Sequence, residues 1–299
     1  MITLKGLYKS ARLRSLPLSL SGIILGSGIA YGQGVFRMDI FLLALLTTML
    51  FQILSDYAND YGDAQKGTDN EHRLGPIRAI QSGEISLSEM KKVVVITAVL
   101  SAISAIVLIF TSFGVDSWYV LLFAVLGAGA IFSAIRYTVG RSAYGYKGLG
   151  DIFVFIFFGI VSVVGSYFLY AQELDRSVFL PAVACGMLSM GVLNLNNMRD
   201  IVNDKQMGKR TIPVKIGFTL AKYYHYFLII VPMLLMMLYS LLNFQFGTQN
   251  LYIFAFIPLI FHLFFVKKTN EPKKLDSQLK VVALSTFLMS ILFFLGKII

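Results

Sequence analysis

The chain has 299 residues, of which 57% are hydrophobic and 14% charged, with a formal net charge of +10. Its mean hydropathy of +0.73 excludes a soluble globular protein and is typical of a protein that crosses a membrane several times. The basic residues lie between hydrophobic runs instead of on one soluble face, so the net charge does not indicate a nucleic acid as partner.

Nine predominantly apolar runs follow one another, and each is long enough to span a bilayer as a helix of about 17–25 residues. The runs are centred on residues 16–35, 39–58, 91–112, 117–135, 151–171, 178–196, 223–243, 250–266 and 279–298. We therefore expect an all-α fold, a bundle of nine transmembrane helices that forms a single membrane-embedded domain over residues 1–299. The connections after the second and sixth runs are the long ones, at about 25–30 residues, and long ordered loops are often functional.

The basic residues also predict which side of the membrane each connection faces. If the N-terminus is cytoplasmic, 23 of the 26 Lys and Arg residues lie in cytoplasmic segments, and only Arg37, Arg176 and Lys297 lie outside. This asymmetry follows the positive-inside rule. We expect the N-terminus and the two long connections to be cytoplasmic and the C-terminus to lie outside.

The second run ends in a polar block, Asn59-Asp60-Tyr61-Gly62-Asp63. If the helix continues to Asp63, then Asp56, Asp60 and Asp63 share one face, because residues four and three apart are neighbours on a helix. Asp56 lies a full turn inside the helix, where a local cap or ion pair also explains it. The charged residues that follow in the same connection are Lys66, Asp69, Arg73 and Arg78.

The connection after the fourth run, residues 136–151, carries three Tyr, three basic residues and one acid. The acid is Asp151, at the expected start of the fifth helix. Asp151 is explained equally well as a favourable charge in a first helical turn and as part of a site.

The sixth run ends in a second block, Asn196-Asn197-Met198-Arg199-Asp200, which lies 137 residues after the first and shares its pattern, Asn-[Asp/Asn]-x-x-Asp. Asp204, Lys209 and Arg210 follow, and Arg210 stands opposite Arg73 in the same register. The match suggests an internal repeat four helices apart, with chance similarity as the alternative.

Both blocks place acids, with bases beside them, at a predicted membrane boundary. Carboxylates are unfavourable there without counter-charge, on the order of 2.5–3.5 kcal/mol each at the bilayer centre and less near its interface. Carboxylate and amide oxygens suit Mg²⁺, while Arg and Lys bind phosphate. The blocks therefore predict a site for Mg²⁺ and a diphosphate, with Arg78 and Lys209 as the strongest phosphate candidates. The alternative is that the helix-end acids only pair with basic residues of the loops.

Other site chemistries have no support in the sequence. There is no P-loop, no strand-associated Gly-x-Gly-x-x-Gly, and no Cys or His spacing for zinc. Cys185 lies in a hydrophobic run, which indicates a small buried side chain. His72 is expected as an exposed loop residue, and a local hydrogen bond is expected to explain His225 and His262.

The extended pattern around both blocks resembles the UbiA superfamily of intramembrane aromatic prenyltransferases. The first block continues as Asn59-Asp60-Tyr61-x-Asp63-x-x-x-Gly67-Thr68-Asp69, then Arg73-Leu-Gly-Pro-x-Arg78. The stretch Tyr146-Lys147-Gly148-Leu149-Gly150-Asp151 and the second block, continued to Asp204, Gly208 and Lys209, extend the resemblance over nearly the whole chain. These motifs are most similar to the menaquinone-pathway branch, whose members prenylate 1,4-dihydroxy-2-naphthoate.

The resemblance implies an integral protein of a bacterial cell membrane that uses Mg²⁺. It implies transfer of a polyprenyl chain from polyprenyl diphosphate to 1,4-dihydroxy-2-naphthoate, with loss of CO₂, to give demethylmenaquinone. The partners would be these two substrates and membrane lipid. Phe and Tyr faces would stabilise an allylic cation.

The residues that the resemblance implies fall into four groups. The catalytic residues would be Asp60, Asp63, Asp200 and Asp204. The metal ligands would be Asn59, Asp60, Asp63, Asp69, Asn197, Asp200 and Asp204. The diphosphate would be bound by Lys66, Arg73, Arg78 and Lys209, and the acceptor by Tyr137, Lys147 and Asp151. The family pattern Asn-Asp-x-x-Asp-x-x-x-Asp has Gly67 at its last position here, which makes Asp69 the candidate for that ligand.

Two other functions remain open. One keeps the fold and changes the acceptor to 4-hydroxybenzoate, homogentisate, haem or a sugar phosphate. The other is a cation transporter that uses the acids as an ion path. A transporter predicts acids spread through the depth of the membrane, whereas here they cluster at one face beside basic residues.

Overall fold

The computed structural model describes residues 3–68, 74–140, 143–243 and 246–299, and within these ranges the regular structure is all helical. The first four spans are built from α1 (Leu4–Ser10), η1 (Leu13–Ser15), α2 (Leu16–Gly32), α3 (Met38–Gln65), α4 (Leu87–Phe113) and α5 (Tyr119–Arg136). The short turn η2 (Tyr144–Lys147) precedes a fifth span made of α6 (Gly150–Val154), the π-helix η3 (Phe155–Gly165) and α7 (Ser166–Ala171).

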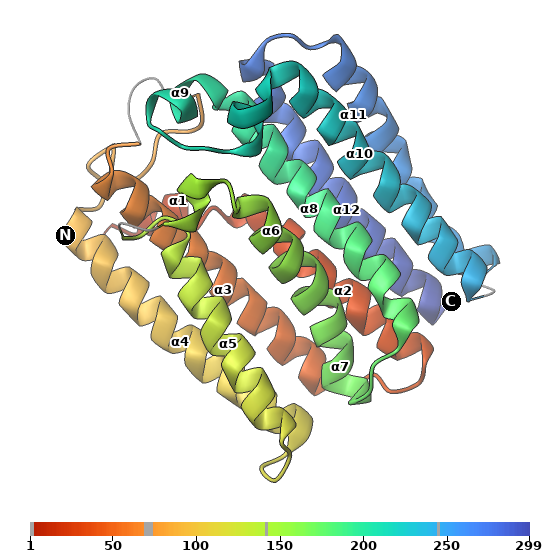
Figure 1. Cartoon of the computed structure of the whole chain (residues 1–299). Helices are drawn as coiled ribbons and strands as arrows, with labels where there is room; N and C mark the ends of the chain where they lie inside the picture. Colours follow the sequence, from red (N-terminus) through yellow and green to blue (C-terminus); the bar gives the residue numbers. More distant parts are fainter. Residues whose placement is uncertain (1–2, 69–73, 141–142, 244–245) are drawn as a thin grey trace.

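The C-terminal half contains η4 (Arg176–Val178), α8 (Phe179–Arg199), α9 (Ile201–Gln206), α10 (Ile212–Leu242), η5 (Gly247–Ala255), α11 (Phe256–Lys268), η6 (Pro272–Leu275) and α12 (Asp276–Ile298). In the part of the chain that the structure describes, nine helical segments are long and apolar enough to cross a membrane, as predicted. They lie side by side in one bundle, with α1 and α9 at one end and the C-terminus of α12 at the other (Figure 1).

One connection differs from the prediction. The expected loop of about 25–30 residues after the sixth run is wrong, because α9 and the start of α10 are helical and only residues 207–211 separate them. Pro213 lies in the first turn of α10, where its fixed φ favours a helix start. Gly217 then interrupts α10 with a φ of 83°, which explains why the apolar run begins later than the helix.

The buried side chains form two hydrophobic clusters. The larger joins α2, η3, α8, α10 and α12 through residues such as Leu25, Val163, Leu188, Ile229 and Met289. The smaller joins α3 to α4 and includes Leu54, Ala58 and Met90. Because the two clusters are separate, the helices between them leave space for a cavity.

Two glycines bring α2 against the π-helix η3. A Cβ atom at Gly22 would lie 1.9 Å from Ser162 Oγ, and one at Gly26 would lie 2.4 Å from the Val163 carbonyl oxygen. Glycine is therefore required at both positions, as at other close helix contacts in membranes.

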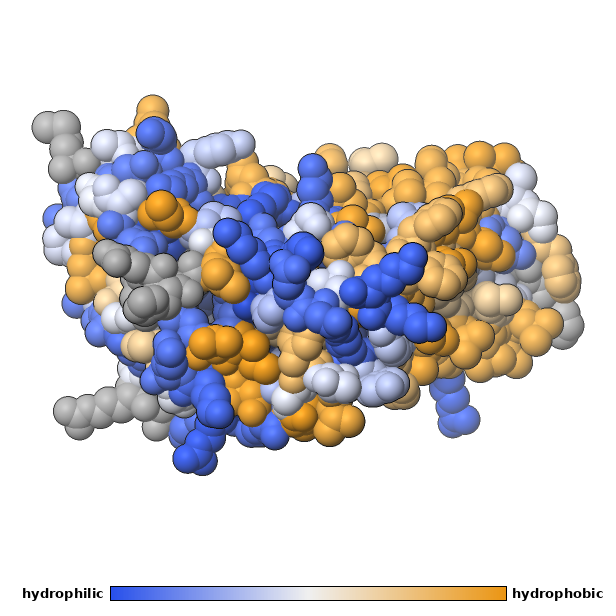
Figure 2. Space-filling view, turned by 90° about the horizontal axis from the view of Figure 1, so that it is seen from above, coloured by the Kyte–Doolittle hydropathy of each residue, from blue (hydrophilic) through white to orange (hydrophobic). Residues whose placement is uncertain are grey.

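The outer surface of the bundle is apolar. Side chains such as Ile96, Leu121, Leu234 and Phe261 are exposed on α4, α5, α10 and α11. Figure 2 shows hydrophilic residues gathered towards one part of the molecule and a broad hydrophobic surface beyond them. Such a surface is unsuited to water and suits lipid, and the chain is an integral membrane protein.

Candidate active site

The acids of the first block lie on one face of α3. The helix continues to Gln65, as the spacing required, and Asp56, Asp60 and Asp63 are 4%, 1% and 4% exposed. Acids this deeply buried need partners, because an unpaired buried carboxylate is strongly unfavourable.

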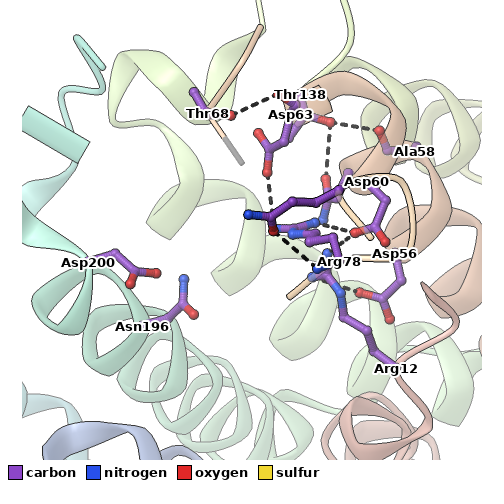
Figure 3. A network of polar contacts seen from close by, with 12 residues as sticks. Arg12, Asp56, Ala58, Asp60, Asp63, Thr68, Arg78, Thr138, Asn196 and Asp200 are labelled. Carbon is purple, nitrogen blue, oxygen red and sulfur yellow. Dashed lines mark hydrogen bonds and ion pairs between the residues drawn. The ribbon is translucent and has the colours of Figure 1, made fainter. Parts of the chain in front are cut away.

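Two arginines from distant segments provide those partners. Asp60 accepts hydrogen bonds from both Arg12 and Arg78, Arg78 Nη2 also lies 3.1 Å from Asp63 Oδ2, and Arg12 Nη1 lies 3.4 Å from Asp56 Oδ1. Figure 3 shows the three acids grouped with these two guanidinium groups, with Asn196 and Asp200 across from them. Arg12 reaches this position from the end of α1 with a left-handed φ of 42°.

The second block is organised around Arg199. Its guanidinium binds both carboxylate oxygens of Asp200, at 3.1 and 2.6 Å, and donates to Asn196 Oδ1 at 2.8 Å. It also pairs with Asp276 at the start of α12. Arg199 thus fixes the Asp200 side chain and ties the end of α8 to α12.

Lys209 brings the two blocks together. Its Nζ lies 3.8 Å from Asp63 Oδ1 and 3.7 Å from Asp204 Oδ1, so one ammonium group is shared by an acid from each block. The turn that returns it over Asp204 passes through Gly208, whose φ of 72° is left-handed, and closes with the Lys209 N–H bonded to the Asp204 carbonyl at 2.8 Å.

Lys66 lies on the other side of the first block. Its Nζ donates to the Thr138 carbonyl at 2.7 Å and lies 3.9 Å from the centre of the Tyr146 ring. Burial lowers the pKa of Lys66, an effect that Asp63 opposes and Lys209 reinforces. Anionic phosphate would favour the charged form of this side chain.

Thr138 connects the first block to the segment after α5. Its hydroxyl lies 3.0 Å from the Ala58 carbonyl and 3.3 Å from Asn59 Oδ1. A Cβ atom at Gly62 would lie 2.7 Å from the Thr138 carbonyl carbon, so the two segments touch at Gly62. Asn59 is therefore held with its amide at the border between the acids and the interior.

The donor set fits a hard divalent cation. Within the described residues, no three Asp, Glu, His or Cys side chains form a preformed metal cluster, because arginines engage the carboxylates. Lys209 nonetheless marks a position where a cation meets Asp63 and Asp204. Asn203 Oδ1 is buried beside Asp204 with no hydrogen-bond partner among the described residues. Oxygen donors of this kind suit Mg²⁺.

An apolar cavity of about 370 Å³ opens beside the first block. Asp56 and Asn59 line it together with Gln52 and Ser55, so its polar end lies on α3 next to Asp60. Away from the acids the walls become apolar. The aromatic and aliphatic side chains that line it include Phe51, Leu108, Ile109, Phe123, Leu126, Phe153, Phe157, Phe158 and Leu169.

The expected acceptor residues differ in their placement. Tyr137 lines the cavity and makes an edge contact with Tyr144, whose ring stacks on Phe153 at 3.8 Å between centroids. Burial raises the pKa of both Tyr137 and Tyr144, so both remain neutral hydrogen-bond donors. Asp151 is buried and accepts a hydrogen bond from Tyr224 at 3.1 Å, whereas Lys147 is exposed and is not part of the cavity wall.

The remaining sequence expectations have mixed outcomes. Asp69, Arg73 and His72 lie outside the described residues. His225 and His262 are hydrogen-bonded to each other at 2.7 Å, and His262 also bonds to Gln278, as a local structural role predicts. Ion pairing of the acids, the alternative to metal binding, does describe the Arg12 and Arg78 contacts. It does not explain why both blocks converge on Lys209.

The sequence did not identify Arg12, Arg199 or Tyr146 as site residues. Arg12 lies 48 residues before Asp60 in a basic stretch that topology already explains, so no local signal distinguishes it. Arg199 and Tyr146 lie inside the motifs, but their role depends on contacts with α12 and with α3, which spacing alone does not reveal.

Comparison with known proteins agrees with this architecture. The profile of the UbiA prenyltransferase family matches residues 19–292. The chain is 40% identical to the 1,4-dihydroxy-2-naphthoate octaprenyltransferase of Haemophilus influenzae, over 99% of this chain and 96% of that protein. It is also 40% identical to the protein of the same name from Escherichia coli, over 96% of this chain and 93% of that protein.

Solved structures show the same fold at lower identity. A UbiA homologue from Aeropyrum pernix matches 94% of this chain and 99% of its own with a TM-score of 0.66 at 15% identity. A UbiA homologue from Archaeoglobus fulgidus, solved with GPP and Mg²⁺, matches 96% of this chain and 98% of its own with a TM-score of 0.64 at 17% identity. The chain belongs to the UbiA prenyltransferase family.

Proposed function

We propose that this protein transfers a polyprenyl chain from polyprenyl diphosphate to 1,4-dihydroxy-2-naphthoate, with loss of the carboxylate as CO₂. The two relatives that are 40% identical over nearly their whole length carry this activity in their names. The observation that carries the proposal is the shared contact of Lys209 with Asp63 and Asp204, at the polar end of an apolar cavity.

The polar end is suited to a diphosphate. Lys66, Arg78 and Lys209 converge on the first block from three segments, and Arg73, outside the described residues, belongs to the same connection as Arg78. Arg binds phosphate oxygens in a bidentate manner and Lys acts as a point charge. These side chains would orient the diphosphate and stabilise its charge as it leaves.

We assign the divalent cation to the two acidic blocks, with Asp60, Asp63, Asp200 and Asp204 as its principal ligands and Asn59, Asn197 and Asp69 as further candidates. Mg²⁺ bound there would supply Lewis-acid stabilisation of the leaving diphosphate. Arg78 would then exchange its carboxylate partners for phosphate oxygens, since it already lies against both Asp60 and Asp63.

The cavity is suited to the prenyl group. The C–O bond of the allylic diphosphate breaks with both electrons going to the diphosphate, and the naphthoate ring supplies the electron pair for the new C–C bond. Between these events the walls of the cavity exclude water, and the faces of Tyr137, Tyr144 and Phe153 stabilise positive charge by cation–π contact. The product is the prenylated naphthoquinol, the reduced form of demethylmenaquinone.

The acceptor would enter beside the same aromatic side chains. Tyr137 is the better placed of the expected residues, because it lines the cavity as a neutral hydroxyl donor. Asp151 is one helical segment away and acts through its bond to Tyr224. Lys147 is exposed and is a weaker candidate.

The enzyme would act as one domain over residues 1–299, with its N-terminus and acidic blocks on the cytoplasmic side and its C-terminus outside. The bias of 23 of 26 basic residues to one side supports this orientation. Membrane lipid would then surround the apolar flank that Figure 2 shows.

The proposal is tested by prenyl transfer with purified protein in detergent, with and without Mg²⁺, against a panel of acceptors that includes 4-hydroxybenzoate and homogentisate. We expect product with 1,4-dihydroxy-2-naphthoate only in the presence of Mg²⁺, and a loss of at least about 100-fold for Asp63→Asn. Asp39→Asn, at the far end of the same helix in an exposed pair with Arg37, is the control. Product with another phenol alone would contradict the acceptor assignment.

A further inference from the structure

Tyr146 belongs to the connection between α5 and α6, yet residues from three other segments contact it. Its hydroxyl donates to Asp63 Oδ1 at 2.7 Å and lies 2.8 Å from Thr68 Oγ1. Its carbonyl accepts from the Arg210 N–H at 2.9 Å. The connections after α3, α5 and α9 therefore meet at this one side chain.

The ring of Tyr146 also lies against two cations. Lys66 Nζ is 3.9 Å and Lys209 Nζ 4.8 Å from the centre of the ring. Two ammonium groups repel each other, whereas each is attracted to the negative face of an aromatic ring. The ring therefore holds both groups within about 5 Å of one point, close enough to act on a single diphosphate.

The hydroxyl fixes the carboxylate that faces the second block. Asp63 Oδ2 is taken by Arg78, while Oδ1 accepts from Tyr146 and lies 3.8 Å from Lys209 Nζ. A carboxylate oxygen has two acceptor sites, so Oδ1 keeps one of them for a cation. Thr68 Oγ1 bonds to the Asp63 carbonyl at 3.1 Å, so the backbone and the side chain of Asp63 are both held.

We propose that Tyr146 is the positioning residue of the diphosphate site. Its ring sets the places of Lys66 and Lys209, and its hydroxyl sets the orientation of Asp63, so that a metal ligand and two phosphate-binding cations are arranged before substrate arrives. This inference rests on the proposed function, because it assigns a role in diphosphate binding. It goes beyond that function in predicting that the two parts of one side chain act on different ligands.

The test separates the hydroxyl from the ring. Calorimetry measures binding of inorganic diphosphate to the full chain in lipid nanodiscs, with and without Mg²⁺, for the wild type, Tyr146→Phe and Tyr146→Leu. Tyr61→Phe is the matched control, because the Tyr61 hydroxyl accepts a hydrogen bond only from Gln65 of its own helix among the contacts of the described residues. Elution volume on gel filtration checks folding.

We expect Tyr146→Phe to weaken Mg²⁺-dependent binding about tenfold and to leave Mg²⁺-independent binding unchanged, since the ring remains. Tyr146→Leu should weaken both, the second by about threefold to tenfold. The KM for polyprenyl diphosphate should rise in both variants while the KM for the acceptor stays the same. Tyr61→Phe should bind like the wild type.

Three results would overturn the inference. Binding by Tyr146→Phe within twofold of the wild type in Mg²⁺ would remove the role of the hydroxyl, and an equal rise of both KM values would indicate a general structural defect. If the wild type itself binds no diphosphate with Mg²⁺, the proposed function fails together with the inference. If Tyr146→Leu does not fold, Tyr146→Phe alone decides the outcome.

Discussion

At the scale of single residues, the acids of the first block are balanced by arginines in the metal-free protein. Asp60 contacts both Arg12 and Arg78, and its side chain is 2% exposed. A buried carboxylate with two guanidinium partners avoids most of the penalty of an isolated charge. Mg²⁺ must therefore compete with arginine for these acids, and diphosphate assists because it offers Arg78 a new partner.

Replacing Arg12 tests this balance. Arg12→Gln should lower the free energy of unfolding by about 1–3 kcal/mol, because Asp56 and Asp60 lose a charged hydrogen-bond partner. The loss should shrink when Mg²⁺ and inorganic diphosphate are both present, because the metal replaces the missing charge. The measurement is the thermal unfolding midpoint in detergent.

Lys5→Gln serves as the control for Arg12, because Lys5 pairs with Glu84 at 3.7 Å on the surface. Exposed pairs contribute about 0–1 kcal/mol. An equal midpoint for the two variants would show that Arg12 does not stabilise the acidic block.

At the scale of helices, the two blocks end in the same way but not in the register that their sequences suggest. Asp63, Gly67 and Thr68 correspond to Asp204, Gly208 and Lys209, each 141 residues later, because both helices end in a left-handed Gly and a returning N–H. The sequence match at 137 residues is one helical turn away. The difference arises because α3 continues unbroken, whereas α8 stops at Arg199 and α9 begins at Ile201.

The turn at Gly208 gives a prediction. Gly208→Ala has room for its methyl group but forces a left-handed φ of 72° on an L-residue, at a cost of about 1–2 kcal/mol. If that cost displaces Lys209, diphosphate binding should weaken by about 5- to 30-fold. Gly34→Ala carries the same strain, with a φ of 75°, in the connection between α2 and α3 at the opposite end, and should not affect binding. Equal binding by both variants would contradict the role of the turn.

The contact between α3 and the segment after α5 gives another. A Cβ atom at Gly62 would lie 2.6 Å from Thr138 Oγ1, so Gly62→Ala should separate the two segments and lower stability by about 1–3 kcal/mol, with loss of activity. Gly129→Ala, in α5 with no atom within 4 Å of the added methyl among the described residues, should be tolerated. Thermal unfolding and prenyl transfer measure both. An active, stable Gly62→Ala variant would contradict this packing.

Much of this level was predictable from the sequence, because hydrophobic runs and helix periodicity report local structure. The nine spans and the extension of α3 to Asp63 were correct. The start of α10 was missed because its first turns carry polar residues and Gly217. Arg12 was missed because its contact with Asp60 joins residues 48 apart through a reversed backbone, which no periodicity records.

At the scale of the molecule, a polar end and an apolar interior are joined by one cavity. The acids of α3 lie at its mouth, and its apolar walls lead between the two hydrophobic clusters. The ends of the chain lie at opposite ends of the bundle (Figure 1), as an odd number of spans requires. This arrangement places a charged reaction at the membrane surface and its greasy substrate within the bundle.

The orientation can be checked with single cysteines, because the native Cys185 is fully buried and should react little. A membrane-impermeant maleimide on intact cells should label Thr248→Cys, near the start of η5, and should not label Ser277→Cys, in the first turn of α12. Both positions are exposed. The reverse pattern would contradict a cytoplasmic N-terminus.

The most direct test of the central claim is the stoichiometry of the reaction. Purified protein is given polyprenyl diphosphate, Mg²⁺ and 1,4-dihydroxy-2-naphthoate labelled in its carboxylate, and released CO₂ and diphosphate are measured together. The account predicts equal amounts of both, matched by prenylated naphthoquinol. Diphosphate release without CO₂, or CO₂ release independent of the prenyl donor, would contradict it.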